Sequence, residues 1–119
     1  MKKLLLIEDD TDAREMITFT FENNGSEVIR ADKEISIQEV SAIKPNIIVI
    51  GYQLNGMPGN DICLKLKADK LTMPIPVILY SATLDVNKIP KNNCADGIVA
   101  KPFELEDLVY LVNRIALLY

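Results

Sequence analysis

The stretch Lys3-Leu4-Leu5-Leu6-Ile7, followed at once by Glu8-Asp9-Asp10, decides the fold class of this chain. A short run that is almost entirely apolar is typical of a strand buried on both faces, because such strands lack alternating polar positions. The acids behind it offer caps for the start of a helix, where negative charge is favoured. A buried strand that leads straight into a helix predicts an α/β fold with a parallel sheet.

The alternation of strand and helix continues along the chain. Only a short turn is expected at 84–89 in place of a full fourth helix, because Pro90 breaks helices and Asn92-Asn93 favours a turn. We therefore predict one α/β domain over residues 1–119, a doubly wound five-stranded parallel sheet of the (βα)5, flavodoxin-like type with a shortened fourth helix. Further strands are expected at 28–31, 46–50, 76–80 and 97–100, and helices at about 13–23, 36–42, 59–70 and 104–118.

Composition narrows the range of functions. The 119 residues carry a net charge of −4 and no basic stretch, which argues against direct nucleic-acid binding. The first apolar run is too short for a signal peptide or a membrane span, so we expect a cytoplasmic protein with no membrane contact. The chain has no histidine, which removes the commonest general base and the Ser-His-Asp and Cys-His arrangements. We therefore expect no enzymatic activity.

The two cysteines, Cys63 and Cys94, have a spacing that suits no zinc site. Cys63 lies among Ile62, Leu64 and Leu66, and is interpreted as a buried structural thiol in a reducing compartment.

The residues that follow the strands should converge at one edge of the sheet, where ligands bind in this fold class. Clustered carboxylates suit Mg²⁺, and a hydroxyl with a lysine suits a phosphoryl group. The sequence therefore predicts one pocket at this edge. Its members are Glu8, Asp9 and Asp10 after the first strand, Gly51, Tyr52 and Gln53 after the third, Ser81 after the fourth and Lys101 after the fifth.

Taken in order, these segments resemble the receiver domain of two-component response regulators over essentially the whole chain. The resemblance implies that Glu8, Asp9 and the backbone carbonyl of Gln53 bind Mg²⁺. It also implies that Ser81 and Lys101 hold phosphoryl oxygens and that a cis bond precedes Pro102. The matching segments are Leu6-Ile7-Glu8-Asp9-Asp10, Pro45 to Ile50, Leu54-Asn55-Gly56-Met57-Pro58-Gly59, Tyr80-Ser81-Ala82 and Ala95 to Phe103 with its Lys101-Pro102-Phe103 ending.

The chain departs from the family pattern at two positions of the pocket. Gly51 stands where the family has the aspartate that accepts a phosphoryl group, and residues 46–60 contain no other aspartate. Glycine empties the space that this carboxylate would fill, so Mg²⁺ binding is expected to be weak. Ile98 stands at the position of the family's aromatic switch residue, and a branched aliphatic side chain cannot rotate a ring into the core.

Simpler structural roles remain open for the same residues. The acidic run could serve only as a helix start, Lys101 could pair with Asp9, and Ser81 could be a turn hydroxyl.

In the last helix, Leu105, Leu108, Val112 and Ile115 form the expected inward stripe. Val109, Tyr110, Leu117 and Tyr119 extend beyond it as a candidate surface patch for a homodimer or a further domain, or the chain continues into a longer protein.

Three hypotheses of function follow. The first is a degenerate receiver that acts as a phosphorylation-independent protein-interaction module, with a sensor kinase, an output domain or another receiver as partner. The second is a phosphorelay receiver that takes its phosphoryl group at Asp9 or Asp10. The third, a flavodoxin-like nucleotide-binding domain, is disfavoured because the loop after the first strand is acidic and lacks phosphate-cradling glycines.

Overall fold

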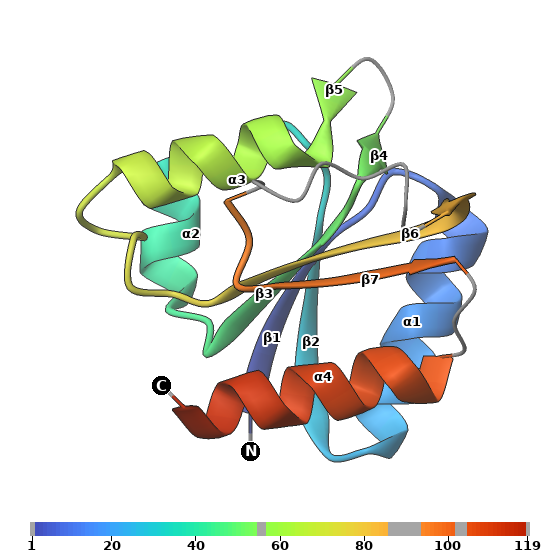
Figure 1. The fold of residues 1–119 in the computed structure, drawn as a ribbon. Coiled ribbons are helices and arrows are strands. Elements are labelled where there is room, and N and C mark those ends of the chain that lie inside the picture. Colours follow the sequence, from blue (N-terminus) through green and yellow to red (C-terminus); the bar gives the residue numbers. More distant parts are fainter. Residues whose placement is uncertain (1, 55–56, 86–93, 102–104, 119) are drawn as a thin grey trace.

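A five-stranded parallel sheet with helices on both faces forms the domain (Figure 1), in a computed structural model that describes residues 2–54, 57–85, 94–101 and 105–118. The strand order is β2-β1-β3-β6-β7, and each neighbouring pair is parallel. The doubly wound arrangement predicted from the sequence is thus confirmed. Its strands are β1 (Lys2–Ile7), β2 (Ser26–Ala31), β3 (Ile47–Gly51), β6 (Val77–Asp85) and β7 (Gly97–Lys101), and its helices are α1 (Thr11–Asn23), α2 (Ile37–Ile43), α3 (Gly59–Ala68) and α4 (Leu105–Leu118).

Each central strand sends side chains into two separate cores, because successive residues of a strand point to opposite faces. In β1, Leu4 and Leu6 pack with α1 and α4, whereas Leu5 and Ile7 pack with α2 and α3. All four of these side chains are completely buried. Burial on both faces explains why the apolar runs in the sequence show no alternation.

The helix starts are fixed by local capping. Asp10 caps α1 by accepting a hydrogen bond from the Ala13 backbone N–H at 2.8 Å. Ser36 and Glu39 form a reciprocal capping box at the start of α2, with hydrogen bonds of 3.1 and 3.0 Å. After α1, Gly25 adopts a φ of +86°, a left-handed conformation that glycine reaches without steric cost.

The region after the fourth strand differs from the prediction. β6 continues to Asp85, so the turn expected from Leu84 is wrong at its first two positions. The extension is explained by pairing with β7, since Asp85 lies opposite Lys101 after an irregularity in register. The rest of the predicted short fourth helix, with Pro90 and Asn92-Asn93, lies outside the described residues, as does the predicted cis bond at Pro102.

A second small sheet lies between the end of β3 and the start of α3. β4 (Gln53–Leu54) pairs antiparallel with β5 (Met57–Pro58) just before α3. This short ladder brings the chain back from the end of β3 to the start of α3.

The last helix presents the predicted inward stripe. Leu108, Val112 and Ile115 are buried in the core, with Leu105 packed beside them. The proposed surface patch is only partly correct, because Val109 also packs against this core. Tyr110 is 64% exposed, and the Arg114 guanidinium lies 5.7 Å from the centre of its ring. The side chains of Leu117 and Tyr119 lie outside the described part.

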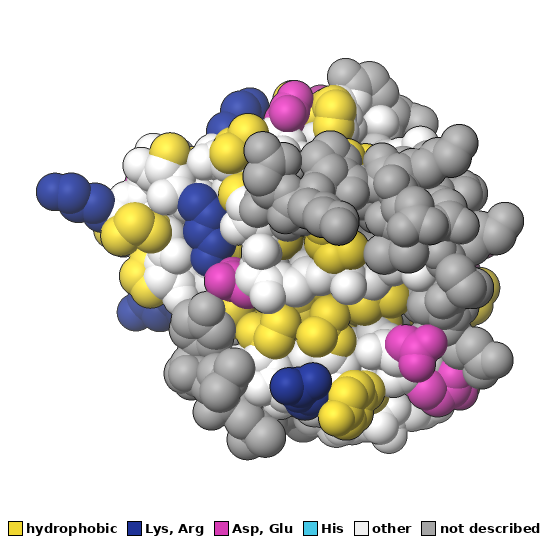
Figure 2. All heavy atoms as spheres, in the orientation of Figure 1, with side chains coloured by type: hydrophobic (Ala, Val, Ile, Leu, Met, Phe, Trp, Pro, Cys, Tyr) yellow, Lys and Arg dark blue, Asp and Glu magenta, His cyan; other side chains and the backbone are white. Residues whose placement is uncertain are grey.

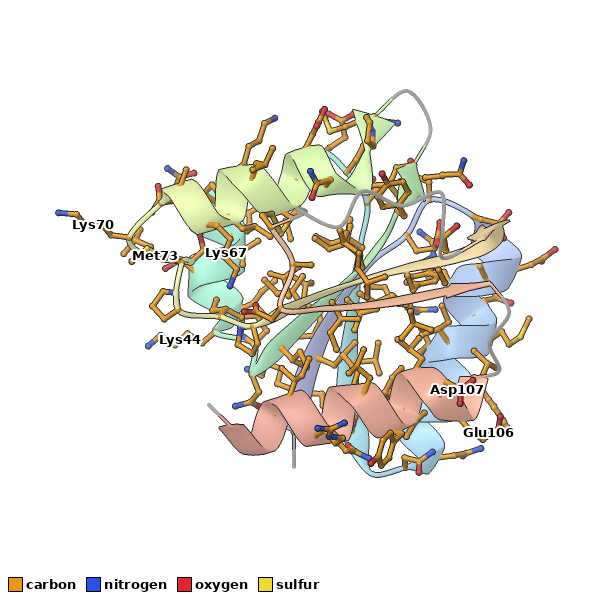
Figure 3. The ribbon with its side chains drawn as sticks, in the orientation of Figure 1. Lys44, Lys67, Lys70, Met73, Glu106 and Asp107 are labelled. Carbon is orange, nitrogen blue, oxygen red and sulfur yellow. A yellow bond between two sulfur atoms is a disulfide. The ribbon has the colours of Figure 1, made fainter. Side chains whose placement is uncertain are left out.

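The face in Figure 2 carries hydrophobic side chains between α4 and β7. The labelled charged residues lie in two groups (Figure 3). Lys44, Lys67 and Lys70 lie at one end of the domain, and Glu106 and Asp107 lie at the other end, at the start of α4. Acidic residues in the first turn of a helix are stabilised by its dipole. None of the helices in the described residues is long and apolar enough to span a bilayer.

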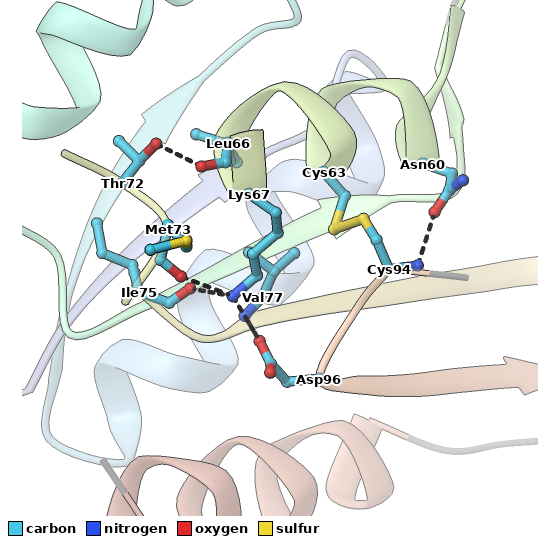
Figure 4. Close-up of a disulfide and its surroundings, with 10 residues drawn as sticks. All are labelled: Asn60, Cys63, Leu66, Lys67, Thr72, Met73, Ile75, Val77, Cys94 and Asp96. Atoms are coloured by element: carbon cyan, nitrogen blue, oxygen red, sulfur yellow. Dashed lines mark hydrogen bonds and ion pairs between the residues drawn. A yellow bond between two sulfur atoms is a disulfide. The ribbon is translucent and has the colours of Figure 1, made fainter. Parts of the chain in front are cut away.

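The interpretation of Cys63 as a free thiol is wrong. Cys63 is fully buried on α3, as predicted, but it forms a disulfide with Cys94 (Figure 4). The two residues are 31 positions apart, and sequence spacing alone gave no reason to pair them. The segment that leads into β7 carries Cys94 to α3, and their Cα atoms lie 6.4 Å apart, within the usual range for a disulfide.

Candidate functional site

The predicted pocket residues gather at the carboxyl ends of the central strands. Glu8 directly follows β1, Gly51 ends β3, and Tyr80 lies opposite Gly51 in β6. Ser81 follows Tyr80 and is 4% exposed. Because β1 and β3 mark the reversal in strand order, this edge is where ligands bind in doubly wound sheets.

The Glu8 carboxylate reaches into part of the space that glycine at position 51 was expected to leave empty. A Cβ atom built on Gly51 would lie 2.7 Å from Glu8 Oε1 and 3.3 Å from the side chain of Leu54. Non-bonded carbon and oxygen atoms do not approach that closely. A side chain at residue 51 would therefore require the end of the Glu8 side chain to shift.

Two hydrogen bonds hold the Glu8 carboxylate in this position. The Tyr80 hydroxyl donates to Oε1, and the Asp10 backbone N–H donates to Oε2 at 3.0 Å. Glu8 is 6% exposed and Tyr80 is 5% exposed. Burial, and then the hydrogen bond to Glu8, raise the pKa of Tyr80 far above its usual range, so the phenol stays protonated as a donor.

The sequence left the role of the Tyr80 hydroxyl unassigned. Tyr80 was named only as part of the Tyr80-Ser81-Ala82 segment, because a strand residue that pairs with Gly51 gives no local signal of its hydrogen-bond partner after β1. The hydrogen bond joins residues 72 positions apart, which only the sheet topology brings together.

The other two acids of the run have partners of their own. Asp10 Oδ2 accepts the capping hydrogen bond from Ala13. Asp9 Oδ2 lies 3.4 Å from Lys33 Nζ in a partly exposed ion pair. Lys33 was not predicted as a partner of Asp9. Lys101 was the predicted candidate partner of Asp9, and although the backbone of Lys101 ends β7, its side chain lies outside the described part of the structure.

A cavity of about 300 Å³ is lined by the acidic run together with Thr11, Asp12 and Gln53. The candidate metal ligands Glu8, Asp9 and Gln53 are therefore brought to one place. They fit a divalent cation poorly, because Glu8 already accepts a hydrogen bond on each oxygen and Asp9 pairs with Lys33. Within the described ranges, no group of three carboxylate, thiol or imidazole side chains is arranged to hold a metal ion.

A second cavity of about 210 Å³ adjoins the first, and Gly51, Tyr80 and Ser81 are among its lining residues. The predicted anion position of Ser81 thus faces the same edge as Gly51. This cavity is predominantly apolar, which gives a phosphoryl group little polar support beyond the residues already named.

Ile98, at the predicted switch position, lies in β7 opposite Leu79. Its partly buried side chain packs against the core beneath α2 and α3. An aliphatic residue therefore packs against the core at this position.

α3 approaches the end of β3 unusually closely. The Gly59 N–H donates to the Tyr52 carbonyl at 2.7 Å, and a Cβ on Gly59 would overlap the Gly51 carbonyl oxygen. Gly59 is therefore required by close backbone approach rather than by a positive φ. The contact sets the distance between α3 and the pocket.

Comparison with known proteins identifies the fold and family. The response regulator receiver domain family matches residues 4–113. The phosphate regulon transcriptional regulatory protein PhoB of Pseudomonas aeruginosa is 33% identical over 114 residues, which cover 91% of this chain and 48% of PhoB. The DNA-binding response regulator MtrA of Mycolicibacterium smegmatis is 27% identical, over 94% of this chain and 49% of MtrA. The chain thus spans about half the length of these curated relatives.

Solved structures agree with this assignment. A putative response regulator from Chloroflexus aurantiacus superposes with a TM-score of 0.83 and 29% identity, and the match covers 97% of both chains. The receiver domain of a sensor histidine kinase from Pseudomonas aeruginosa, solved with a magnesium ion in its active site cleft, has a TM-score of 0.80 at 20% identity over 97% of both chains. With its strand order and the carboxyl-edge pocket, this chain belongs to the response regulator receiver domain family of two-component signalling.

Proposed function

We propose that this receiver domain signals as a protein-interaction module whose state does not depend on a phosphoryl group at position 51. The observation that carries the proposal is the Glu8 carboxylate, which stands 2.7 Å from where a Cβ at Gly51 would lie and is held there by Tyr80. A pocket built to accept a phosphoryl group needs a reactive carboxylate with space around it. Here the carboxylate is buried and hydrogen-bonded on both oxygens.

The alternative acceptors are poorly placed for phosphoryl transfer. Asp10 is committed to capping α1, so an acyl phosphate there would remove a helix cap worth about 0.5–2 kcal/mol. Asp9 is paired with Lys33, and a phosphoryl group on Asp9 would disturb this ion pair. Both interactions support the phosphorylation-independent proposal over the hypothesis of a non-standard acceptor.

Mg²⁺ is proposed to bind weakly. Asp9 and the backbone carbonyl of Gln53 would hold it, with Glu8 joining only after release from Tyr80. When bound, the ion would neutralise the acidic edge of the pocket. In the absence of a carboxylate at residue 51, water would supply most of the remaining ligands.

The proposed partners are proteins: a sensor kinase, another receiver or an output domain. PhoB and MtrA are named as a transcriptional regulatory protein and a DNA-binding response regulator, and this chain spans about half the length of each. An output domain on a longer form of this protein is therefore part of the proposal. The chain itself, with a net charge of −4, is proposed to make no direct nucleic-acid contact and to act without enzymatic activity in the cytoplasm.

A homodimer through the last helix is the proposed self-association. Tyr110 on α4 and Met16 and Phe19 on α1 are more than half exposed, and the two helices are in contact. Large exposed apolar side chains on adjacent helices are typical of interaction surfaces.

The proposal is tested by intact-protein mass spectrometry after incubation with Mg²⁺ and acetyl phosphate. The wild type, Gly51→Asp and the double variant Gly51→Asp/Tyr80→Phe are compared. The wild type should gain no phosphoryl group. The double variant should be modified more than Gly51→Asp alone, because loss of the Tyr80 hydroxyl lets Glu8 move away from the new side chain.

A phosphoryl group on the wild type would refute the proposal and favour the non-standard acceptor. Asp9→Asn and Asp10→Asn would then show which carboxylate is modified. Equal modification of the single and double variants would show that Tyr80 does not restrain Glu8, although the wild-type result would stand.

A further inference from the structure

We propose that Cys63 and Cys94 form a reversible redox-modification site, in which Cys94 reacts with a small-molecule disulfide and Cys63 completes the internal bond. This inference does not depend on whether the receiver is phosphorylated. It starts from the disulfide that joins α3 to the segment before β7 (Figure 4).

Contacts other than the disulfide hold the two cysteines near each other. The Asn60 side-chain oxygen accepts a hydrogen bond from the Cys94 backbone N–H at 3.4 Å. Two turns along α3 from Asn60, Lys67 forms an ion pair of 2.9 Å with Asp96. Asn60, Cys63 and Lys67 occupy positions i, i+3 and i+7, so they share one face of the helix.

The ion pair is anchored on both sides. Asp96 Oδ2 also accepts a hydrogen bond from the Val77 backbone N–H at 2.8 Å, and Lys67 Nζ donates to the Ile75 carbonyl at 2.8 Å. Figure 4 shows these bonds beside the disulfide. These hydrogen bonds and the ion pair do not require the sulfur–sulfur bond, so we expect the reduced protein to keep both thiols in position. Reoxidation is then an intramolecular step with a high effective concentration.

The two sulfurs differ in access to solvent. Cys63 is completely buried in the core beneath α3, whereas Cys94 is only partly buried. Exchange requires a thiolate to approach a disulfide sulfur, so access determines which cysteine reacts first. An external reagent reaches Cys94, and Cys63 acts as the resolving thiol.

The reaction balances in two exchange steps. The Cys94 thiolate attacks one sulfur of the small disulfide, whose S–S bond breaks and whose other half leaves as a thiolate that takes up a proton. Cys63 then loses its proton and attacks Cys94 Sγ, which expels the second half as a thiol. Two protein thiols are oxidised by two electrons in total, and one reagent disulfide is reduced to two thiols. Excess thiol reverses both steps.

Oxidised glutathione is the probe for this site, added to fully reduced protein under native conditions. Intact mass and thiol counting by alkylation follow the wild type, Cys63→Ser and Cys94→Ser. The wild type should lose both free thiols without keeping a glutathione adduct. Cys63→Ser should keep a mixed disulfide on Cys94, and Cys94→Ser should react at least tenfold more slowly.

A second measurement requires no variant. Reduced wild-type protein is briefly alkylated, and peptide mapping should find Cys94 labelled before Cys63. The proposal fails if the two cysteines label at equal rates, if the wild type accumulates the adduct, or if it keeps both thiols. It also fails if the reduced protein is unfolded by circular dichroism, because the bond would then be a structural requirement rather than a reversible modification.

Discussion

Replacement of Tyr80 by phenylalanine removes the hydroxyl that holds Glu8 and leaves the packing of the ring intact. Glu8 Oε1 then stays buried without its donor. A hydrogen bond to a charged group contributes about 1.5–3 kcal/mol, so we expect a loss of about 2 kcal/mol in unfolding free energy. For 119 residues the unfolding entropy is about 250 cal/mol/K, which converts this loss to a fall of about 8 °C in Tm.

The assay is thermal and urea unfolding of wild type and Tyr80→Phe, with Tyr110→Phe as the matched control. Tyr110 is 64% exposed, and its variant should stay within about 0.5 kcal/mol of wild type. A Tyr80→Phe variant as stable as the control would refute the conclusion that Tyr80 restrains the Glu8 carboxylate.

The difference in unfolding free energy between wild type and Tyr80→Phe should depend on pH. The pKa of Tyr80 is raised in the folded state, so its contribution is fully present below the unfolded value of about 10. Above that pH the unfolded phenol releases its proton and the folded one does not. The stability advantage of wild type over Tyr80→Phe should therefore shrink as pH rises beyond about 10, by at most about 1.4 kcal/mol per pH unit.

Three further predictions concern other parts of the domain. Gly59→Ala should cost about 1–3 kcal/mol in urea unfolding, because the new Cβ overlaps the Gly51 carbonyl oxygen, and an unchanged midpoint would contradict this backbone contact. Reduction of the disulfide, which closes a loop of 31 residues, should lower the unfolding free energy by about 3–4 kcal/mol without unfolding the domain, as urea titrations with and without reductant would show. Lys33→Ala should tighten Mg²⁺ binding by up to about fivefold in calorimetry, since it frees Asp9 from an ion pair worth about 0.2–1 kcal/mol, whereas the exposed control Lys70→Ala should change nothing.

Local sequence signals predicted the elements of the sheet and most helix boundaries. Continuous apolar runs mark the central strands β1 and β3, which are buried on both faces, whereas the edge strand β2 carries Glu27 and Arg30 and was predicted only over its last four residues. Asp10 and Ser36 fix the starts of α1 and α2 through hydrogen bonds to backbone groups three residues away. A few consecutive residues of the sequence are therefore enough to predict where these helices begin. The continuation of β6 to Asp85 was missed because it depends on pairing with β7.

Contacts between elements could not be predicted, because they depend on side-chain direction at the sheet edge. The sequence placed Glu8 in the pocket, but gave no sign that its carboxylate turns toward Gly51 and bonds Tyr80. Lys33 lies 24 positions from Asp9, and Cys94 lies 31 positions from Cys63. Each of these pairs is formed only once the strand order brings its two segments together.

The position of Glu8 beside Gly51 couples residue 51 to Tyr80 through a shared carboxylate. A side chain introduced at residue 51 would place its Cβ 2.7 Å from Glu8 Oε1, so the end of the Glu8 side chain would have to move aside. That movement would break the hydrogen bond that Tyr80 donates to the same oxygen. Occupancy at residue 51 and the stability that Tyr80 contributes are therefore linked, and a gain in one is a loss in the other.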